Sequence, residues 1–349
     1  MIPVFDGHND FIQRVAAAGK DGARVWLEGD GTGHLDLPRA KEGGVVGGFF
    51  AIWVPSPHNP NDAEAIAMME NPPFNMPLPD EIPHDVALPH AFEQAAALQM
   101  LARTGTLDIV KSAADIRSSI DAGRFAAIMH MEGIEAIRDM DALHLWHAAG
   151  LRSLGPVWSR PTRYGNGVPF AFPSSPDTGE GLTKLGKDLV RECNALRILL
   201  DLSHLNEAGF NDIAKLSDAP LVATHSCVHA ISESSRNLTD RQLSVIADSN
   251  GVVGLNYASS FLREDGKRLP LEGLDTMLRH LDHLLNILSE DGVALGSDFD
   301  GALMPRDLAT AADLPNLIQA MRDHGYDDDL IRKIACENWI NVLERTWGH

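Results

Sequence analysis

The chain has 349 residues, of which 44% are hydrophobic and 22% charged, a composition typical of a globular protein with a sizeable core. Its 49 acidic residues outnumber its 29 lysines and arginines, and the formal net charge of -20 argues against nucleic acids and anionic membranes as partners. The length suits two average domains or one α/β barrel with insertions.

The three cysteines, Cys193, Cys227 and Cys336, are scattered and show no CxxC spacing, which favours a reducing compartment. The first residues contain neither a basic segment nor a long apolar stretch, so we expect no signal peptide and no transmembrane span. We therefore predict a cytoplasmic protein.

Short apolar runs without strict alternation predict parallel strands that are covered on both faces. In chain order they are Pro3–Phe5, Val45–Val54, Phe125–Met131, Leu151–Val157, Arg197–Leu202, Leu221–Thr224, Gly251–Asn256 and Gly292–Gly296. Amphipathic segments between them predict helices at Ala136–Ala149, Gly181–Leu196, Asn206–Leu216, Thr239–Asp248 and Leu274–Ser289. Eight such alternations favour a TIM-type (β/α)8 barrel, one domain over residues 1–349.

Two segments interrupt this alternation, at about 55–90 and at 162–181. The first holds nine of the twenty prolines between Pro55 and Pro89, and the second is rich in Gly, Pro and Ser. Both follow the carboxyl end of a predicted strand, where barrel enzymes carry site-forming loops. They can form a lid or substrate wall, or else a surface excursion or subunit contact. The stretch from Asp327 to Trp347 predicts two packed helices that close the barrel's side.

Polar side chains stand at the ends of the predicted strands. His8 and Asp10 are two residues apart, so in an extended segment they point the same way and can reach one metal ion, or they serve only local hydrogen bonds. Glu132 ends the third strand, where a carboxylate is costly unless it is paired or coordinated. It could bridge two cations or contact the start of the following helix.

The fifth and sixth strands end at His204 and His225, and the eighth ends at Asp298. Two matched histidines at one mouth of a barrel favour metal ligands over structural histidines. Asp298 can face a metal-bound water or form an Asx turn, and Asp300 fits that turn or a supporting role. We find no Gly-x-Ser-x-Gly elbow and no phosphate-binding glycine loop, so a catalytic metal is the simplest common cause.

At this point the sequence resembles the membrane (renal) dipeptidase family, peptidase family M19 of the amidohydrolase superfamily. The resemblance runs from Val4 to the final helices. It is carried by Asp6-Gly7-His8-Asn9-Asp10, Met131-Glu132-Gly133, Asp201-Leu202-Ser203-His204, Thr224-His225-Ser226, Ser235-Arg236-Asn237 and Ser297-Asp298-Phe299-Asp300-Gly301. These motifs are specific as a set, although each alone is not.

The resemblance implies a zinc metallopeptidase that hydrolyses small dipeptides with two Zn²⁺ ions at the carboxyl ends of the strands, although another first-row divalent metal is compatible. It implies that one zinc is bound by His8 and Asp10, the other by His204 and His225, and that Glu132 bridges both. Asp298 would handle the proton of the bridging water. Arg236 would clamp the carboxylate of the dipeptide, with Tyr257 assisting.

Two departures from the family pattern stand out. The family's better-known members carry a signal peptide and a membrane-anchoring C-terminus, and neither is expected here. They also carry a substrate-contacting histidine after the fourth strand, where this chain reads Gly155-Pro156-Val157-Trp158-Ser159-Arg160. An indole cannot polarise a carbonyl as imidazole can, so Trp158 is expected to wall the pocket, or to pack beneath the loop at 162–181.

Other functions remain open at this stage. The same metals could serve another amidohydrolase reaction, such as deacylation of an N-acyl amino acid or opening of a lactam or lactone. A catalytically silent metal- or peptide-binding barrel is the alternative from another class, because the fold alone does not exclude it. The expected partners are small dipeptides, and a homo-oligomer is possible.

Overall fold

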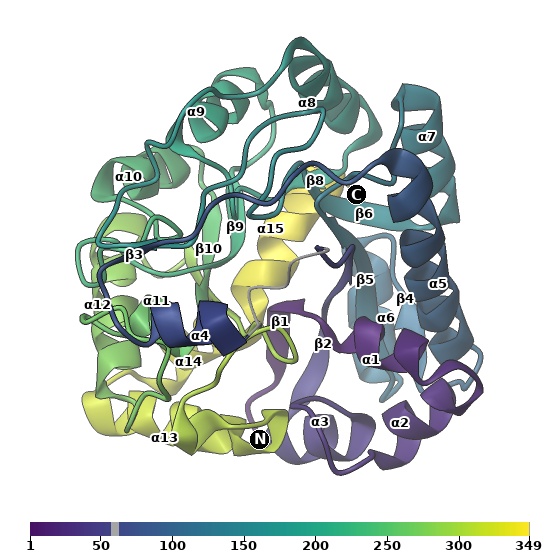
Figure 1. Cartoon of the computed structure of the whole chain (residues 1–349). Helices are drawn as coiled ribbons and strands as arrows, with labels where there is room; N and C mark the ends of the chain where they lie inside the picture. Colours follow the sequence, from purple (N-terminus) through teal and green to yellow (C-terminus); the bar gives the residue numbers. More distant parts are fainter. Residues whose placement is uncertain (57–62, 349) are drawn as a thin grey trace.

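A closed barrel of parallel strands forms the centre of the computed structural model, which describes residues 1–56 and 63–348 (Figure 1). Within this part of the chain one sheet has the order β1-β2-β5-β6-β8, with β4 (Leu107–Ile109) beside β5, and another has the order β11-β10-β9. The parallel bridges Asn9–Phe299 and Asp201–Val222 join the two sheets at both seams. The predicted (β/α)8 barrel is therefore confirmed.

All eight predicted strands are present, with shifted ends. They are β1 (Val4–Asn9), β2 (Val45–Trp53), β5 (Phe125–Glu132), β6 (Leu151–Gly155), β8 (Leu199–Leu200), β9 (Val222–Ser226), β10 (Val252–Asn256) and β11 (Val293–Gly296). The largest extension is in β1, which continues beyond Phe5 because the buried carboxylate of Asp6 accepts hydrogen bonds from the amide and hydroxyl of Ser297, beside β11. Hydrogen bonds across the barrel thus hold a polar segment in strand conformation.

The five predicted helices surround the barrel as α7 (Met140–Ala149), α8 (Lys184–Leu196), α9 (Glu207–Leu216), α10 (Asp240–Asp248) and α12 (Asp275–Leu288). Side-chain caps explain where several begin: Thr183, Asn206 and Thr239 each accept a hydrogen bond from the amide three residues on. Helices that the sequence analysis did not specify include α1 (Phe11–Ala17), α2 (Gly22–Glu28), α3 (Leu37–Gly43), α6 (Ala113–Asp121), α11 (Ser259–Leu262) and α13 (Leu314–His324).

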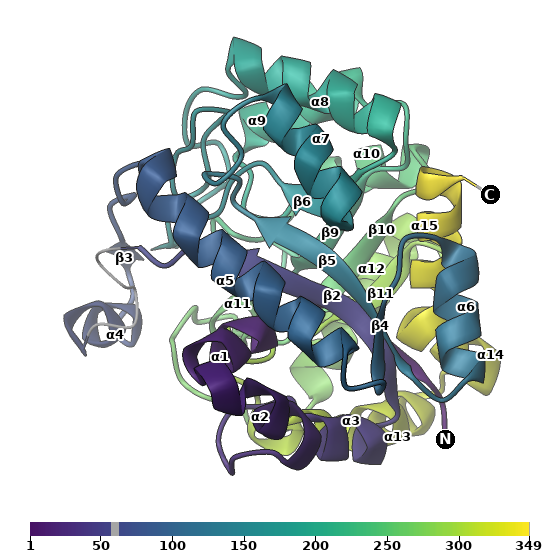
Figure 2. The same ribbon diagram turned by 90° about the vertical axis from the view of Figure 1, so that its right-hand side faces the viewer.

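The two predicted insertions meet each other. Within them β3 (Phe74–Asn75) pairs antiparallel with β7 (Ala171–Phe172), and Figure 2 shows α4 (Ala63–Met69) projecting beyond this pair. Helix α5 (His84–Ala102), which contains Pro89, begins inside the segment predicted as the first insertion. Residues 57–62 of this insertion lie outside the described residues.

The C-terminal helices close one end of the barrel, not its side as predicted. Helix α14 (Asp328–Arg332) continues through a π-helical turn, Lys333–Glu337, into α15 (Asn338–Trp347), which Figure 1 shows across the middle of the ring of strands. Trp339 of α15 packs with residues from the amino-terminal parts of the strands, and a Cβ at Gly7 or Gly254 would lie within 2.8 Å of its indole. These two glycines leave the space that the indole needs.

Candidate metal centre

The carboxyl ends of five barrel strands bring the six predicted polar residues together. His8 lies in β1 and Asp10 follows it, Glu132 ends β5, His204 follows β8, His225 lies in β9 and Asp298 follows β11. The side chains of the five predicted ligands are buried, whereas Asp298 is partly exposed. Glu132 is not a helix cap, because α7 begins eight residues later with Asp139 as its capping residue.

Glu132 lies between two sets of possible ligands. Its Oε1 atom is 3.1 Å from Nε2 of His204, 3.3 Å from Nε2 of His225 and 3.8 Å from Nε2 of His8. One set of donor atoms that could hold a metal comes from His8, Asp10 and Glu132, and another from Glu132, His204 and His225. A carboxylate common to both sets is the arrangement that a bridging ligand requires.

Whether these residues fit a metal ion can be judged from the hydrogen bonds that their buried ligand atoms make or lack. In the described part of the chain, the buried atoms Glu132 Oε1 and His8 Nε2 have no hydrogen-bond partner. Buried polar atoms without partners are rare and costly, and a divalent cation would satisfy both atoms at once. The donor set therefore fits a metal.

Burial and neighbouring charges shift the pKa values of the candidate metal ligands. Burial, together with the neighbouring Asp10 and Asp298, raises the pKa of Glu132 to about 8. Burial opposes a charged imidazole at His8, but Glu132 and Asp10 outweigh it and raise the pKa of His8 to about 10. Burial lowers the pKa of His204 and of His225 well below the usual range, which keeps both rings neutral as metal ligands require.

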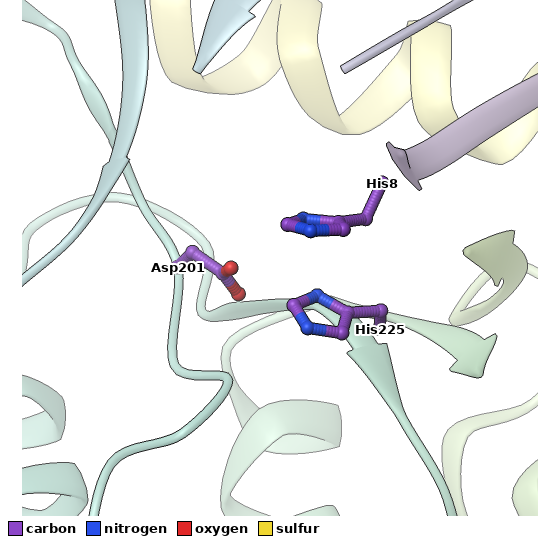
Figure 3. Close-up of side chains that lie close together, drawn as sticks. All are labelled: His8, Asp201 and His225. Carbon is purple, nitrogen blue, oxygen red and sulfur yellow. The ribbon is translucent and has the colours of Figure 1, made fainter. Parts of the chain in front are cut away.

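Asp201 is a polar residue whose role the sequence analysis missed, although its motif was recognised. Figure 3 shows its carboxylate near the rings of His8 and His225, and these three residues form a further group of possible ligands. The Asp201 oxygens are already engaged, however: the Ser203 amide, the Thr224 amide and the Thr224 hydroxyl all donate to them. Glu132 Oε1 is therefore the better donor for a metal.

Asp201 instead orients His225 through Thr224. The Thr224 hydroxyl donates to Asp201 over 2.6 Å, so its oxygen is free to accept a hydrogen bond from Nδ1 of His225, 2.8 Å away. We assign the Nδ1–H tautomer to His225 on this basis, which leaves a lone pair on the Nε2 atom that faces Glu132. Ser159 lies in the corresponding place beside His204, with its hydroxyl 2.8 Å from Nδ1.

Backbone strain accompanies two of the functional side chains. His204 has a φ of 66° and Asp298 a φ of 61°, in the left-handed region that favours glycine. The Asp298 carboxylate accepts a hydrogen bond from the Asn256 amide over 2.9 Å, and burial raises its pKa, with Asp10 adding to the effect. A Cβ at Gly301 would lie 2.0 Å from Asp10 Oδ2 and 2.6 Å from Asp298 Oδ1, so glycine keeps this space open.

Asp300 also has a positive φ, 67°, and its carboxylate accepts hydrogen bonds from the His34 amide and from Arg14. These hydrogen bonds tie the loop after β11 to Arg14 and to the backbone at His34. Gln13, which the sequence analysis did not single out, donates to Asp10 over 2.6 Å. Only its position one helical turn after Asp10 could have suggested this contact.

A cavity of about 200 Å³ opens over the candidate metal centre. Its polar lining includes Asp10, Glu132, His204 and Asp298, and its apolar lining includes Trp53, Trp158, Phe170 and Phe261. Trp158 thus lines the cavity. Its ring centre lies 5.2 Å from that of Trp53 and 5.6 Å from that of Phe170. The indole forms a wall of this space.

The structure does not bring Arg236 and Tyr257 to the lining of this cavity in the described residues. Arg236 is buried directly behind it, donating to the Ser226 hydroxyl and to the His225 carbonyl, with its Nε atom unpartnered among described residues. Burial lowers the pKa of Arg236, and the charges of Glu132 and Asp298 oppose this shift. Tyr257 is fully buried, its ring 5.7 Å from that of Phe299, and burial raises its pKa well above the usual range.

Known proteins share both this sequence and this fold. The model of the family described as membrane dipeptidase (Peptidase family M19) matches residues 1–347. The chain belongs to the membrane dipeptidase family. A metallopeptidase from Rhodobacter sphaeroides, crystallised with a phosphinate mimic of the dipeptide L-Ala-D-Ala, is 58% identical over 99% of both chains, with a TM-score of 0.97.

Two further proteins are similar to this chain. A family M19 metallopeptidase called dipeptidase AC, known from a crystal structure, is 58% identical in sequence to this chain. The match covers 100% of this chain and 99% of that one, with a TM-score of 0.96. A protein from the pqqA 5' region of Klebsiella pneumoniae is 46% identical over 262 residues, 73% of this chain and 96% of its own. The predicted family and metal-dependent dipeptidase activity are thus confirmed. No helix within residues 1–56 and 63–348 is long and apolar enough to cross a membrane.

Proposed function

We propose that this membrane dipeptidase family member hydrolyses small dipeptides with two zinc ions. His8 and Asp10 would hold one ion, His204 and His225 the other, and Glu132 would be shared. The observation that carries this proposal is the buried Oε1 atom of Glu132, which lies between the two ligand sets and has no hydrogen-bond partner among the described residues. When bound, a pair of divalent ions supplies Lewis acidity for the carbonyl and lowers the pKa of water.

Asp298 is the group that we propose to transfer the proton. Its raised pKa and its contact with the cavity suit a carboxylate that takes a proton from the attacking water and returns it to the leaving amine. The Asn256 amide holds one oxygen in place and leaves the other to face Asp10 and Gly301. The same carboxylate can therefore serve both proton transfers, first from the attacking water and then to the leaving amine.

Substrate orientation is the proposed role of Arg236. Its buried guanidinium would attract the terminal carboxylate of a dipeptide, and its Nε atom, which has no partner in the described part of the chain, would be available as a donor. Tyr257 would assist by packing against Phe299, beside the loop that carries Asp298. Trp158 would contact the substrate side chain and exclude water.

A substrate panel on metal-replete enzyme tests this function. We expect hydrolysis of dipeptides with free carboxylates and little turnover of N-acyl amino acids, lactams or lactones. Preferential turnover of one of those rivals would overturn the proposal. The relative from Rhodobacter sphaeroides binds an L-Ala-D-Ala mimic, so the panel includes dipeptides with an L- and with a D-residue in second place.

We also propose a cytoplasmic location, because Cys193, Cys227 and Cys336 are all free and buried. A homo-oligomer is compatible with this function, and sedimentation of the purified protein measures it. The formal net charge of -20 argues against polyanions as partners.

A further inference from the structure

A fully buried arginine, Arg160, packs behind an aromatic wall of the cavity formed by Trp53 and Trp158. It is not among the described residues that line the cavity. Its Nε atom donates to Oε1 of Glu135 over 2.6 Å, Nη1 to the Ser56 hydroxyl over 2.7 Å and Nη2 to the Val54 carbonyl over 2.8 Å. These partners follow β2 and β5, whereas Arg160 itself follows β6. One guanidinium therefore joins three segments at the carboxyl end of the barrel.

The same guanidinium packs against two indoles that line the cavity. Its central carbon lies 5.4 Å from the ring centre of Trp158 and 6.0 Å from that of Trp53. The two indoles meet edge to face at 5.2 Å and 70°. The Arg160 amide also donates to the Trp158 carbonyl over 2.7 Å, so both backbone and side chain of Arg160 define the place of Trp158.

Burying the Arg160–Glu135 ion pair costs desolvation free energy, so the pair needs an explanation other than stability. Both side chains are fully buried, and a buried ion pair contributes little net stability compared with apolar residues of similar volume. Its contacts are specific, because only a planar fork can reach three acceptors in different directions while presenting a flat face to an indole. The pair is thus better explained by the geometry that it imposes than by stability.

We propose that Arg160, held by Glu135, is a positioning residue that sets the side-chain selectivity of the dipeptidase by fixing Trp53 and Trp158 as a rigid wall. This inference rests on the proposed function and deepens it. A rigid aromatic wall favours dipeptides whose apolar side chain packs against it over those that carry only glycine. A loosened wall loses this preference, while the metal centre and the proton-transfer carboxylate keep their geometry.

Steady-state kinetics of Arg160→Lys and Glu135→Gln test this inference. The lysine keeps the charge without the planar fork, and the glutamine keeps a hydrogen-bond acceptor without the charge. The measured quantity is the ratio of kcat/KM for a leucine-containing dipeptide to kcat/KM for glycylglycine. We expect this ratio to fall about fivefold or more in Arg160→Lys, through KM, and less in Glu135→Gln, with metal content unchanged.

Tyr164→Phe is the matched control. Tyr164 is fully buried in the same loop region, and its hydroxyl donates to the Ile137 carbonyl over 2.7 Å. Among the described residues no ring contact joins it to Trp53 or Trp158, whose ring partners are each other, Phe170 and His204. We expect this variant to lower thermal stability and leave the ratio as in the wild type. A ratio that falls equally in Tyr164→Phe would show a general structural effect and overturn the inference.

An unchanged ratio in folded Arg160→Lys overturns the inference, as does an equal loss for both dipeptides together with loss of metal. If Arg160→Lys does not fold, Glu135→Gln decides by the same ratio. A wild-type enzyme that hydrolyses no dipeptide would instead overturn the proposed function. Crystal structures of the two variants then decide the inference without activity, because it requires the Trp158 indole to be displaced, and an indole in its original place contradicts it.

Discussion

The two ends of the barrel use the same strands for different purposes. At the amino-terminal end the Trp339 indole fills the interior, 5.1 Å from the Phe49 ring, and its Nε1 atom donates to the Leu295 carbonyl. At the carboxyl end Glu132 Oε1 has no hydrogen-bond partner among the described residues, and His204 has a positive φ. The amino-terminal end thus contributes packing. The carboxyl end keeps backbone strain and unpaired ligand atoms that a metal ion can use.

Removing the indole at the packed end should have the largest effect on free energy. Trp339→Ala leaves a cavity between Gly7 and Gly254, and we expect the free energy of unfolding to fall by about 3 to 5 kcal/mol. Catalysis by the remaining folded enzyme should change little, because no ligand is touched. Chemical unfolding and initial rates measure the two effects, and a loss of metal without a loss of stability would contradict the division between the ends.

At the other end Asp298→Asn should change activity and spare the fold. Asparagine tolerates the φ of 61° at this position, so the substitution removes only the charge and the proton-transfer group. We expect both metals to stay and kcat to fall on the order of a hundredfold or more. Metal analysis accompanies the kinetics, because an equal loss of metal would make Asp298 mainly a ligand.

At the carboxyl end of the barrel, Arg236→Met separates substrate orientation from metal binding. Without the guanidinium, dipeptides with a free carboxylate should lose about tenfold in kcat/KM relative to their C-terminal amides, since a charge-assisted contact disappears. Rates on paired acid and amide substrates measure the difference. Equal losses on both would remove Arg236 from the substrate site.

The smallest expected effect concerns Trp158. Trp158→Ala should raise KM a few-fold and change the order of side-chain preference, because a wall of the cavity is lost, with only a modest fall in kcat. Trp158→His should not improve turnover. A uniform loss across a panel of side-chain sizes, in step with lower thermal stability, would assign Trp158 to packing alone.

Local patterns explain which parts of the fold were predictable. Apolar runs marked all eight barrel strands, including β8, which has only two residues, and amphipathic segments marked five of the surrounding helices, such as α10. Helix α5 was missed because Pro83 and Pro89 favour a loop, yet Pro83 is the capping residue and Pro89 lies inside the helix. Tertiary packing of α5 against the barrel overrides that local preference.

The candidate ligands could be named from the sequence because each stands at the end of a strand, and the barrel brings those ends together. Asp201 and Arg160 could not be assigned in the same way. Arg160 contacts Ser56 across 104 positions in the chain, and Asp201 acts on His225 through Thr224. Such roles depend on packing between distant segments, which periodicity and motif spacing do not encode.

The number of metal ions bound per chain tests the central claim most directly. Elemental analysis of the purified enzyme, before and after a chelator and after added zinc, should show about two divalent ions in the active form, because two ligand sets share Glu132. Activity should disappear with the ions and return with zinc. A metal-free protein with full activity, or full activity with a single ion per chain, would contradict the account.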